Sequence, residues 1–257
     1  MEIVLTIAGS DPSGGAGIQQ DLRTIESLGC YGASVITALT TQNTLGVQSV
    51  MPVPADVVRS QLEAVLSDLD VKAIKIGQIP SADVAHAIAE TLSHHLTPIT
   101  HHPIILDPVM ISTSGRRLMS EDAIDIVVSE LFPLCTLITP NIPEMETLSG
   151  LSGFNACNYN ILIKGGHAEG SEMADRLCLA NGTERVYATE KIESTNLHGT
   201  GCALSSAIAS SLALGYSLED AVARGKDYVT EAIRRGKDLD IGHGNGPVFY
   251  KRIDNNE

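Results

Sequence analysis

The chain has 257 residues, 43% of them hydrophobic, and a formal net charge of -14 with a pI of about 4.9. This length and apolar content suffice for a sizeable core, and no Pro/Ser-rich linker or low-complexity segment divides the sequence, so we expect a single domain over residues 1–257. The acidic balance argues against nucleic acid and anionic membranes as partners, since both require a basic surface.

The amino terminus and the cysteine pattern predict a cytoplasmic protein. The opening run M-E-I-V-L-T-I-A lacks the basic residues that begin a signal peptide, and no segment is long and apolar enough to span a membrane. The five cysteines are scattered, odd in number and without a C-x-x-C pair, which suits a reducing compartment and gives no zinc pattern. The histidine pairs at 94–95 and 101–102 lack partner ligands, so we interpret them as solvated loop residues.

Short β-branched runs alternate with longer amphipathic segments through the first two thirds of the chain. We expect strands at residues 3–8, 33–38, 73–77, 103–107, 136–140 and 161–165, and helices at 16–28, 55–69, 82–96 and 121–131. Strand–helix alternation predicts right-handed crossovers and an α/β fold, with a mostly parallel sheet covered by helices on both faces. Ligands of such sheets sit beyond the carboxyl ends of the strands.

The last third of the chain departs from this alternation. The runs D-R-L-C-L-A and R-V-Y-A-T-E flank Asn181-Gly182, which predicts a hairpin and therefore an antiparallel edge on the sheet. Two consecutive helices are expected at 201–214 and 218–236. Ser217 is the expected N-cap of the second, with Asp220 in its first turn.

Polar or glycine-rich stretches follow the first two strands. G-S-D-P-S-G-G-A-G at 9–17 matches neither the P-loop nor the G-x-G-x-x-G fingerprint, so it is either a flexible turn or a loop whose amides approach a small ligand, with Asp21 one helical turn further on. In T-T-Q-N-T at 40–44, Gln42 can both donate and accept hydrogen bonds. That suits the edge of a planar heterocycle, but an ordinary polar turn explains the residues equally well.

Two later strands end in candidate metal ligands. Asp107 ends one strand and Pro108 blocks its continuation, so this aspartate either holds a metal or phosphate or caps a turn. Asn141 and Glu144 follow the next strand, and Mg²⁺ prefers such oxygen ligands, with Glu144 acting directly or through water. The alternative is a helix cap by Asn141 with a first-turn glutamate.

The stretch H-G-T-G-C at 198–202 predicts an anion site. The amides of Gly199, Thr200, Gly201 and Cys202 precede or open a helix, where they lack intrahelical partners and meet the positive end of the helix dipole. Such donors would stabilise the charge on a phosphoryl group in transfer. A thiol at a helix N-terminus is biased toward the thiolate, so Cys202 is predicted to accept a proton from an attacking hydroxyl. A purely structural cysteine is the alternative.

Seven motifs occur in a fixed order along the chain: G-S-D-P-S-G-G-A-G-I-Q, V-I-T-A-L-T-T-Q-N-T-x-G-V, K-I-G, D-P-V-M, L-I-T-P-N-x-P-E, I-K-G-G-H and H-G-T-G-C-A-L-S-S-A-I-A. Together they resemble the bacterial hydroxymethylpyrimidine/phosphomethylpyrimidine kinases of thiamin biosynthesis, members of the ribokinase-like superfamily. The resemblance runs from about Ile3 to Val248, nearly the whole chain.

The resemblance implies an ATP- and Mg²⁺-dependent enzyme, expected as a homodimer, that phosphorylates 4-amino-5-hydroxymethyl-2-methylpyrimidine and then its monophosphate. It implies that Gln42 hydrogen-bonds the aminopyrimidine. The other residues that it places around this substrate are Gly9, Ala16, Asp21 and Val109.

The resemblance also assigns the nucleotide side. It implies that Asn141 and Glu144 organise Mg²⁺ and the ATP phosphates, and that Gly199–Cys202 form the anion hole. Cys202 would occupy the place where many sugar kinases of the superfamily carry an aspartate base. The residues expected to lie beside the nucleotide are Lys164, Gly165 and Gly166.

Two features depart from the family pattern. The K-I-G motif is usually followed by a methionine that packs on the pyrimidine, whereas Gln78 stands here, and a polar amide at an apolar contact costs free energy unless it finds a partner. The second is a shortened connection at 150–160, where the family has a full helix. The apolar surface that this helix would cover must be masked otherwise, for example by a subunit partner.

Three other functions remain open at this point. Pyridoxal kinase is the nearest, since related enzymes accept both ring types and Gln78 makes the pocket more polar. A cysteine hydrolase would use Cys202 as nucleophile and His198 as base. A pyrimidine-binding protein that has lost catalysis would agree with the shortened connection.

Overall fold

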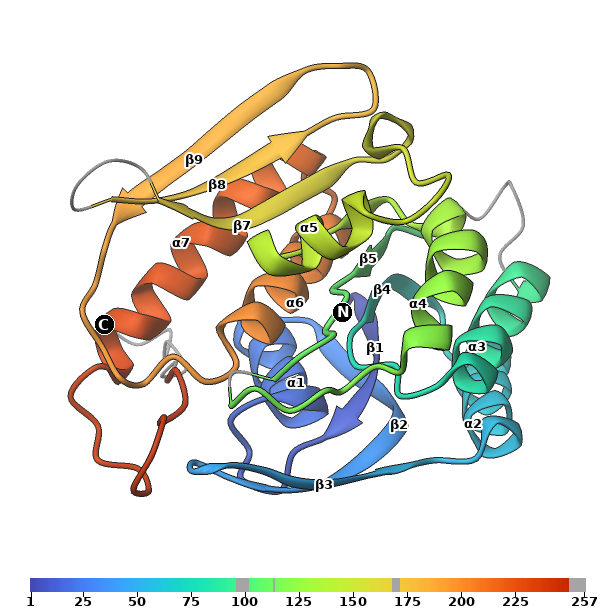
Figure 1. The fold of residues 1–257 in the computed structure, drawn as a ribbon, viewed down its shortest axis with the longest axis horizontal. Helices are drawn as coiled ribbons and strands as arrows, with labels where there is room; N and C mark the ends of the chain where they lie inside the picture. Colours follow the sequence, from blue (N-terminus) through green and yellow to red (C-terminus); the bar gives the residue numbers. More distant parts are fainter. Residues whose placement is uncertain (96–101, 113, 168–171, 250–257) are drawn as a thin grey trace.

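The computed structural model describes residues 1–95, 102–112, 114–167 and 172–249, and its central element is one mixed β-sheet (Figure 1). The nine described strands follow the order β3-β2-β1-β4-β5-β6-β7-β8-β9. The strands are β1 Ile3–Ser10, β2 Tyr31–Asn43, β3 Gly46–Pro52, β4 Val71–Ile76, β5 Ile104–Leu106, β6 Leu137–Ile138, β7 Ile161–His167, β8 Glu172–Cys178 and β9 Glu184–Glu190. The α-helices are α1 Gly17–Ser27, α2 Ala55–Asp68, α3 Ala82–His95, α4 Glu121–Ile126, α5 Ile142–Ser149, α6 Thr200–Ala213 and α7 Leu218–Gly236.

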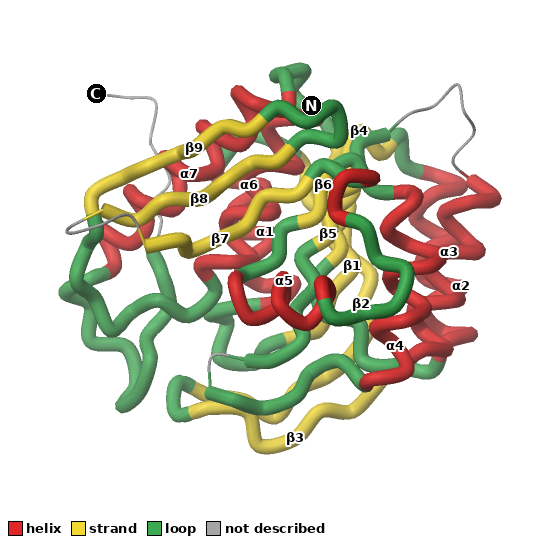
Figure 2. Tube along the Cα trace, turned by 45° about the horizontal axis from the view of Figure 1, so that its top comes forward, coloured by secondary structure: helices red, strands yellow, loops and turns green. Residues whose placement is uncertain are grey.

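Helices cover both faces of the sheet, which gives three layers (Figure 2). From β2 through β1, β4, β5 and β6 to β7, neighbouring strands are parallel. Because side chains alternate along a strand, Leu5 of β1 packs into the core beneath α2, α3 and α4, whereas Val4 packs into the core beneath α1, α6 and α7. The predicted α/β class is confirmed.

Both edges of the sheet are antiparallel, although only one such edge was predicted. The hairpin of β8 and β9 turns through Gly182, with a φ of +85°, as expected. The hairpin of β2 and β3 was not predicted, and β2 continues to Asn43, so most of the expected turn at 40–44 is strand. The side chains of β3 are exposed or half-buried, so this segment lacks the buried apolar run that marks a strand.

The helices agree with the predictions except at two places. Helices α1, α2, α6 and α7 match their predicted ranges to within one residue at each end. The histidines at 94–95 end α3 and do not lie in a loop, while His101 lies outside the described residues. The predicted helix at 121–131 becomes α4, a wider π-turn and a 3₁₀ turn containing Pro133, whose missing N–H interrupts the α-helical bonding. None of the helices in the described ranges is long and apolar enough to cross a membrane.

Aromatic rings anchor the short connection between α5 and β7 to the rest of the chain. Phe154 and Tyr159, both on the connection, stack with ring centroids 5.9 Å apart. Each also meets the buried Phe132 edge-on, at 6.3 and 5.6 Å. Such pairs contribute about 0.5–1.5 kcal/mol beyond their buried area. These rings therefore mask apolar surface at the shortened connection from within the chain.

Replacing Phe154 by alanine tests this masking. We expect Phe154→Ala to lower the free energy of unfolding by about 2 kcal/mol, less than a fully buried phenylalanine costs, because the ring is only partly buried. Urea unfolding measures the loss. Met51→Ala, exposed on β3, is the control and should change stability by less than about 0.5 kcal/mol. Equal effects of the two substitutions would show that the rings do not stabilise the connection.

Candidate active site

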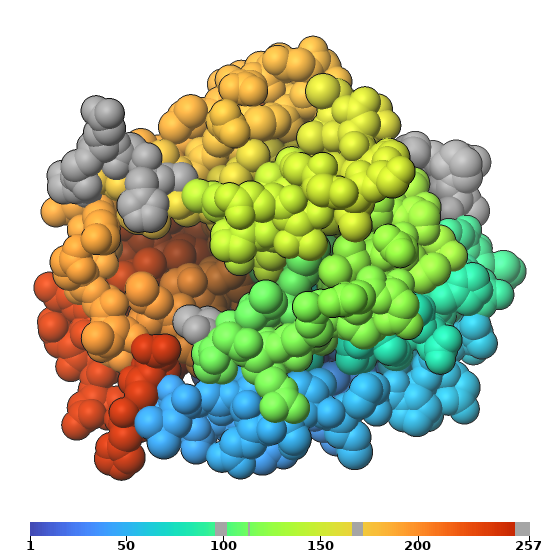
Figure 3. Space-filling view, viewed as in Figure 1, coloured from blue at the N-terminus to red at the C-terminus, as the bar shows by residue number. Residues whose placement is uncertain are grey.

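A cavity of about 460 Å³ lies beyond the carboxyl ends of the parallel strands. Figure 3 shows it as the hollow between the orange and red carboxy-terminal elements and the green segments in the middle of the chain. Its wall includes residues from each predicted strand-end motif and from the turn before α6. The geometry thus agrees with the expectation that the polar strand ends gather around one site.

One part of the cavity carries the residues predicted for the heterocycle. Gly9, Ala16, Gln42, Gln78 and Val109 all line it. A Cβ on Gly9 would lie 2.1 Å from Gln78 Oε1, so a larger residue at position 9 would displace the end of the Gln78 side chain. Gln78 Nε2 is buried and has no hydrogen-bond partner among the described residues, a situation that costs about 1–3 kcal/mol. The ligand-free site therefore carries the free-energy cost that was expected for the polar amide of Gln78.

Asp21 does not line the cavity, and the prediction that it contacts the substrate is corrected. Its carboxylate is fully buried and accepts hydrogen bonds from Thr6 Oγ1 at 2.6 Å and Ser206 Oγ at 2.8 Å. It also pairs with the fully buried Lys75, whose Nζ lies 2.7 Å away. Burial is the largest influence and would lower the pKa of Lys75, but the charge and hydrogen bond of Asp21, together with the nearby Cys202 and Asp107, raise this pKa. Asp21 is a structural anchor beneath the site, joining β1, β4, α1 and α6.

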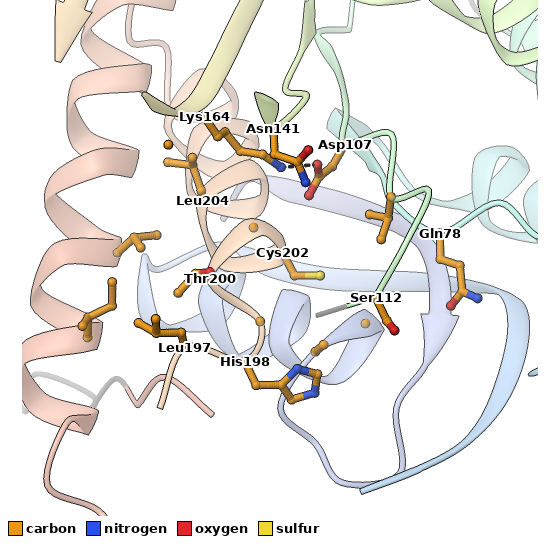
Figure 4. Close-up of a pocket in the computed structure, with 18 of the residues that line it drawn as sticks. Gln78, Asp107, Ser112, Asn141, Lys164, Leu197, His198, Thr200, Cys202 and Leu204 are labelled. Carbon is orange, nitrogen blue, oxygen red and sulfur yellow. Dashed lines mark hydrogen bonds and ion pairs between the residues drawn. The ribbon is translucent and has the colours of Figure 1, made fainter. Parts of the chain in front are cut away.

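An ion pair of Asp107 and Lys164 forms another part of the wall. Lys164 Nζ lies 2.5 Å from Asp107 Oδ1, close to the first turn of α6 (Figure 4). A Cβ on Gly201 would lie 3.2 Å from Asp107 Oδ2 and 3.4 Å from Lys164 Nζ, so glycine lets the helix approach the pair. Burial opposes the charge of Lys164, but Asp107 and Glu144 outweigh it and raise the pKa of the lysine. The lysine is therefore a fixed cation in the site.

Asn141 and Glu144 form a helix cap and also line the cavity. Asn141 Oδ1 accepts from the Glu144 amide at 2.9 Å, and Glu144 Oε2 accepts from the Asn141 amide at 2.8 Å, which is the capping box of the alternative interpretation. Burial is the largest influence on Glu144 and raises its pKa to about 7, while Lys164 opposes the rise and Asp107 adds to it. A cation bound nearby would favour the charged form.

Sequence patterns did not reveal three charged residues of the site: the buried Lys75 and Asp175, and the half-buried Lys226. Asp175 accepts from the Gly165 amide and from Lys226 Nζ, both at 2.8 Å, and all three residues line the cavity. Gly165 lines the cavity, and Gly166 continues β7 and pairs with β8. Lys75 could have been noticed in the sequence, because it is a lysine inside an apolar strand. The pair of Asp175 and Lys226 could not, because the two residues lie 51 positions apart.

The turn before α6 has much of the predicted anion-site geometry. Gly199 is the N-cap, with a φ of +82°, and a Cβ there would lie 1.9 Å from the Gly15 carbonyl oxygen, so glycine is required. The amides of Gly201 and Cys202 belong to the first turn, where a helix offers no acceptor. The Thr200 amide donates within the turn at 3.3 Å, so it adds less to the anion site than predicted.

The thiol of Cys202 lacks the predicted bias toward the thiolate. Burial is the largest influence and raises its pKa to about 11. The charge of Lys75 and the Gly17 amide favour the thiolate, but those of Asp21 and Asp107 oppose it. Burial therefore outweighs the Lys75 charge and the Gly17 bond, and the ligand-free site holds a neutral thiol at neutral pH.

His198 and Cys202 occupy the same turn without interacting (Figure 4). His198 Nε2 lies 2.8 Å from Asp11 Oδ2 and 3.0 Å from Gln42 Nε2. No hydrogen bond or ion pair between described residues joins it to Cys202. A cysteine hydrolase needs an imidazole that activates its thiol, so the geometry argues against that alternative.

These features define the class of the protein. A cavity at the strand ends of a mostly parallel sheet, a buried lysine–aspartate pair and a glycine turn that opens a helix are the parts of a ribokinase-like small-molecule kinase. The chain belongs to the phosphomethylpyrimidine kinase family, whose sequence model matches residues 11–249.

Known members of this family resemble the chain over almost its whole length. The hydroxymethylpyrimidine/phosphomethylpyrimidine kinase of Rhizobium meliloti is 44% identical over 262 residues, which cover 96% of each chain. The Escherichia coli protein of the same name is 40% identical over 260 residues, with the same coverage. The family expected from the seven ordered motifs is confirmed.

Solved structures agree with the fold. The crystal structure of phosphomethylpyrimidine kinase from Clostridium difficile has a TM-score of 0.75 and 41% identity, covering 91% of this chain and 100% of that one. An ADP complex of Bacillus subtilis pyridoxal kinase has a TM-score of 0.85 and 29% identity, covering 100% of both. The ribokinase-like fold is confirmed, and the higher identity to hydroxymethylpyrimidine kinases favours that activity over pyridoxal kinase.

The charges beneath Cys202 can be tested through its alkylation. We expect the alkylation rate of Cys202 to rise with pH until about pH 11, because only the thiolate reacts and burial holds its pKa there. At pH 10, Lys75→Met should slow the reaction and Asp21→Asn should accelerate it, since they remove charges of opposite sign. Peptide-resolved mass spectrometry separates Cys202 from the other four cysteines.

The double variant Lys75→Met/Asp21→Asn is the matched control. It removes the same ion pair without leaving a lone charge, so its alkylation rate should stay near that of the wild type. If both single variants moved the rate in the same direction, altered packing rather than charge would be responsible.

Proposed function

We propose that the protein transfers the terminal phosphoryl group of ATP to the hydroxymethyl group of 4-amino-5-hydroxymethyl-2-methylpyrimidine, and then phosphorylates the monophosphate to the diphosphate. One observation carries the proposal: a single cavity brings Gln42 together with the Asp107–Lys164 pair in a chain of the phosphomethylpyrimidine kinase family. The ADP bound to the related Bacillus subtilis pyridoxal kinase supports a nucleotide as the donor.

Gln42 is suited to hold the pyrimidine ring. The substrate carries an amino donor beside a ring-nitrogen acceptor, and a carboxamide complements such an edge with one oxygen and one N–H. Gly9, without a side chain, and Val109 line the same cavity. Together they would leave a flat, partly apolar space in which the ring is held by its polar edge.

The fixed charges would stabilise the group in transfer. Phosphoryl transfer depends on positioning and charge stabilisation more than on covalent chemistry by the protein. Lys164 supplies a buried cation, and the amides of Gly201 and Cys202 supply donors at the positive end of α6. Lys226, held by Asp175, is a second paired cation in the cavity wall.

Mg²⁺ would accompany ATP, and the residues present fit it. Mg²⁺ commonly binds through one or two carboxylates plus phosphate oxygens and keeps several waters. Asp107 and Glu144 offer such carboxylates, and the described part of the chain contains no group of three or more His, Cys, Asp or Glu residues that would enclose a metal. Bound there, the ion would neutralise phosphate charge, while the two carboxylates would hold it directly or through water.

Cys202 would accept the proton of the substrate hydroxymethyl group. With a pKa of about 11, roughly one thiol in 10³–10⁴ is ionised near pH 7.5, so the thiolate is a minor species of the free protein. The need for a base arises in the first phosphorylation, where the acceptor is an alcohol. In the second the acceptor is already a phosphate anion, and the cations and amides matter more.

Product analysis tests the proposed function. With Mg-ATP we expect the monophosphate and then the diphosphate of hydroxymethylpyrimidine, identified by mass. We expect kcat/KM for this substrate to exceed that for pyridoxal by at least about ten-fold, because its amino group and ring nitrogen match the carboxamide of Gln42.

Other products would change the assignment. A preference for pyridoxal would overturn the substrate, and monophosphate as the only product would remove the second step. If no ATP were consumed in the presence of the pyrimidine, a binding protein without catalysis would be favoured.

Substitution of Cys202 separates the two steps. Cys202→Ala should lower kcat for hydroxymethylpyrimidine by about 10²–10⁴ and abolish the rise of kcat between pH 7 and 10, which reflects the growing thiolate fraction below a pKa of about 11. The kcat for phosphorylation of the monophosphate should fall much less. Steady-state kinetics with each acceptor measure both. A loss of only a few-fold, equal for the two acceptors, would exclude Cys202 as the base and leave the kinase assignment intact.

A further inference from the structure

We propose that His198 positions the pyrimidine by fixing which way the carboxamide of Gln42 faces. His198 acts through Gln42 and is a positioning residue rather than a catalytic one. The identity of the ligand rests on the proposed function, whereas the arrangement of the two side chains concerns this chain alone.

Asp11, beside His198, carries a negative charge. Its buried carboxylate accepts from the Ser13 amide at 2.9 Å, the Ser13 hydroxyl at 2.7 Å and the Ala16 amide at 2.9 Å. Burial would raise the pKa of Asp11, but the bonds from His198 and Ser13 outweigh it and hold this pKa below its usual value. An ionised carboxylate has no hydrogen to donate, so the hydrogen of the 2.8 Å contact lies on His198 Nε2.

The proton on His198 then decides the orientation of Gln42. An imidazole nitrogen that carries a hydrogen cannot accept one. The Nε2 position of Gln42 lies 3.0 Å from His198 Nε2, where two donors would face each other. The oxygen and nitrogen of a carboxamide occupy almost equivalent positions. The stable arrangement is therefore the one rotated by half a turn, with the Gln42 oxygen toward His198.

Thr40 favours the same orientation independently. Its hydroxyl donates its one hydrogen to the Ser10 carbonyl at 2.9 Å. It can therefore only accept from the other carboxamide position of Gln42, which lies 3.3 Å away. With the Gln42 nitrogen there, it donates to Thr40, and the Gln42 oxygen shares the one His198 Nε2 hydrogen with Asp11. The opposite orientation leaves one donor–donor and one acceptor–acceptor contact. At a partly buried site each such contact is costly.

The backbone holds His198 in place for this task. The His198 amide donates to the Gly246 carbonyl at 3.0 Å, and the His198 carbonyl accepts from the Val248 amide at 3.2 Å. A Cβ on Gly15 would lie 2.3 Å from His198 Cδ2, so glycine there leaves space for the ring. The imidazole is thus fixed before any ligand arrives.

The direction of the carboxamide determines how a ring can bind. Gln42 lines the cavity and offers it one N–H beside one oxygen lone pair, in an order that His198 sets. An aminopyrimidine matches that order in one of two orientations. Because its hydroxymethyl group is adjacent to the amino group, a reversed carboxamide would turn the ring over and move the reacting hydroxyl to the other side. His198 therefore selects the productive orientation.

The proton position can be measured without any activity. Long-range ¹H–¹⁵N spectra of the full chain labelled with [¹⁵N]histidine report the protonation of each ring nitrogen. We expect a protonated Nε2 for His198 in the ligand-free protein at neutral pH, assigned by the loss of its signals in His198→Gln. An unprotonated Nε2 would overturn the proposal.

Kinetics of two variants test the consequence for binding. His198→Leu removes the ring donor, whereas His198→Gln is the matched control that retains an N–H at a similar reach. We expect His198→Leu to raise KM for hydroxymethylpyrimidine by about ten-fold or more while KM for ATP stays within about two-fold, and His198→Gln to recover most of the loss.

Two outcomes would contradict the proposal. His198 would only support the fold if the KM for hydroxymethylpyrimidine rose equally in both variants. The same would follow if the KM values for hydroxymethylpyrimidine and ATP rose together. A wild-type chain that does not phosphorylate hydroxymethylpyrimidine would overturn the proposed function instead, and the ¹⁵N spectrum would still decide where the proton of His198 lies.

Discussion

The fully buried ion pair of Lys75 and Asp21 is the interaction on which the arrangement of the site depends. Lys75 comes from β4 and Asp21 from α1, and the same carboxylate also binds Thr6 of β1 and Ser206 of α6. Removing one partner of a buried pair typically costs about 3–5 kcal/mol, because a lone charge remains in the core. This carboxylate therefore holds the four elements beneath the cavity together and fixes the position of the first turn of α6 relative to the sheet.

Paired cations let this acidic chain keep positive charge where phosphates would bind. The chain carries a net charge of -14, yet three lysines line the cavity and each is paired with an aspartate: Lys75, Lys164 and Lys226. An unpaired buried ammonium would lose its proton or destabilise the fold. The aspartates keep the lysines charged and limit their movement, and lysine donors not used by these pairs remain available to a ligand.

Local patterns were enough to predict most of the sheet and the strand ends that form the site, because strand–helix alternation depends on neighbours in sequence. They failed at β3, whose side chains are largely exposed. Asp21 was misassigned because a motif shows that a residue is near a site, not whether its side chain points into the cavity or beneath it. The pKa of Cys202 was misjudged because it depends on burial and on Asp107, from another part of the chain, and not only on its own helix.

The neutral thiol at position 202 agrees with a site that must take two different acceptors. An alcohol needs a base, and the proposed function gives this role to the minor thiolate form of Cys202. A phosphate acceptor instead brings negative charge beside the nucleotide phosphates. A permanently ionised carboxylate at this position would repel that acceptor, whereas a thiol with a pKa of about 11 stays uncharged beside it. The burial that weakens Cys202 as a base in the first step would therefore help the second, with Lys164 and the first-turn amides of α6 left to balance the charge.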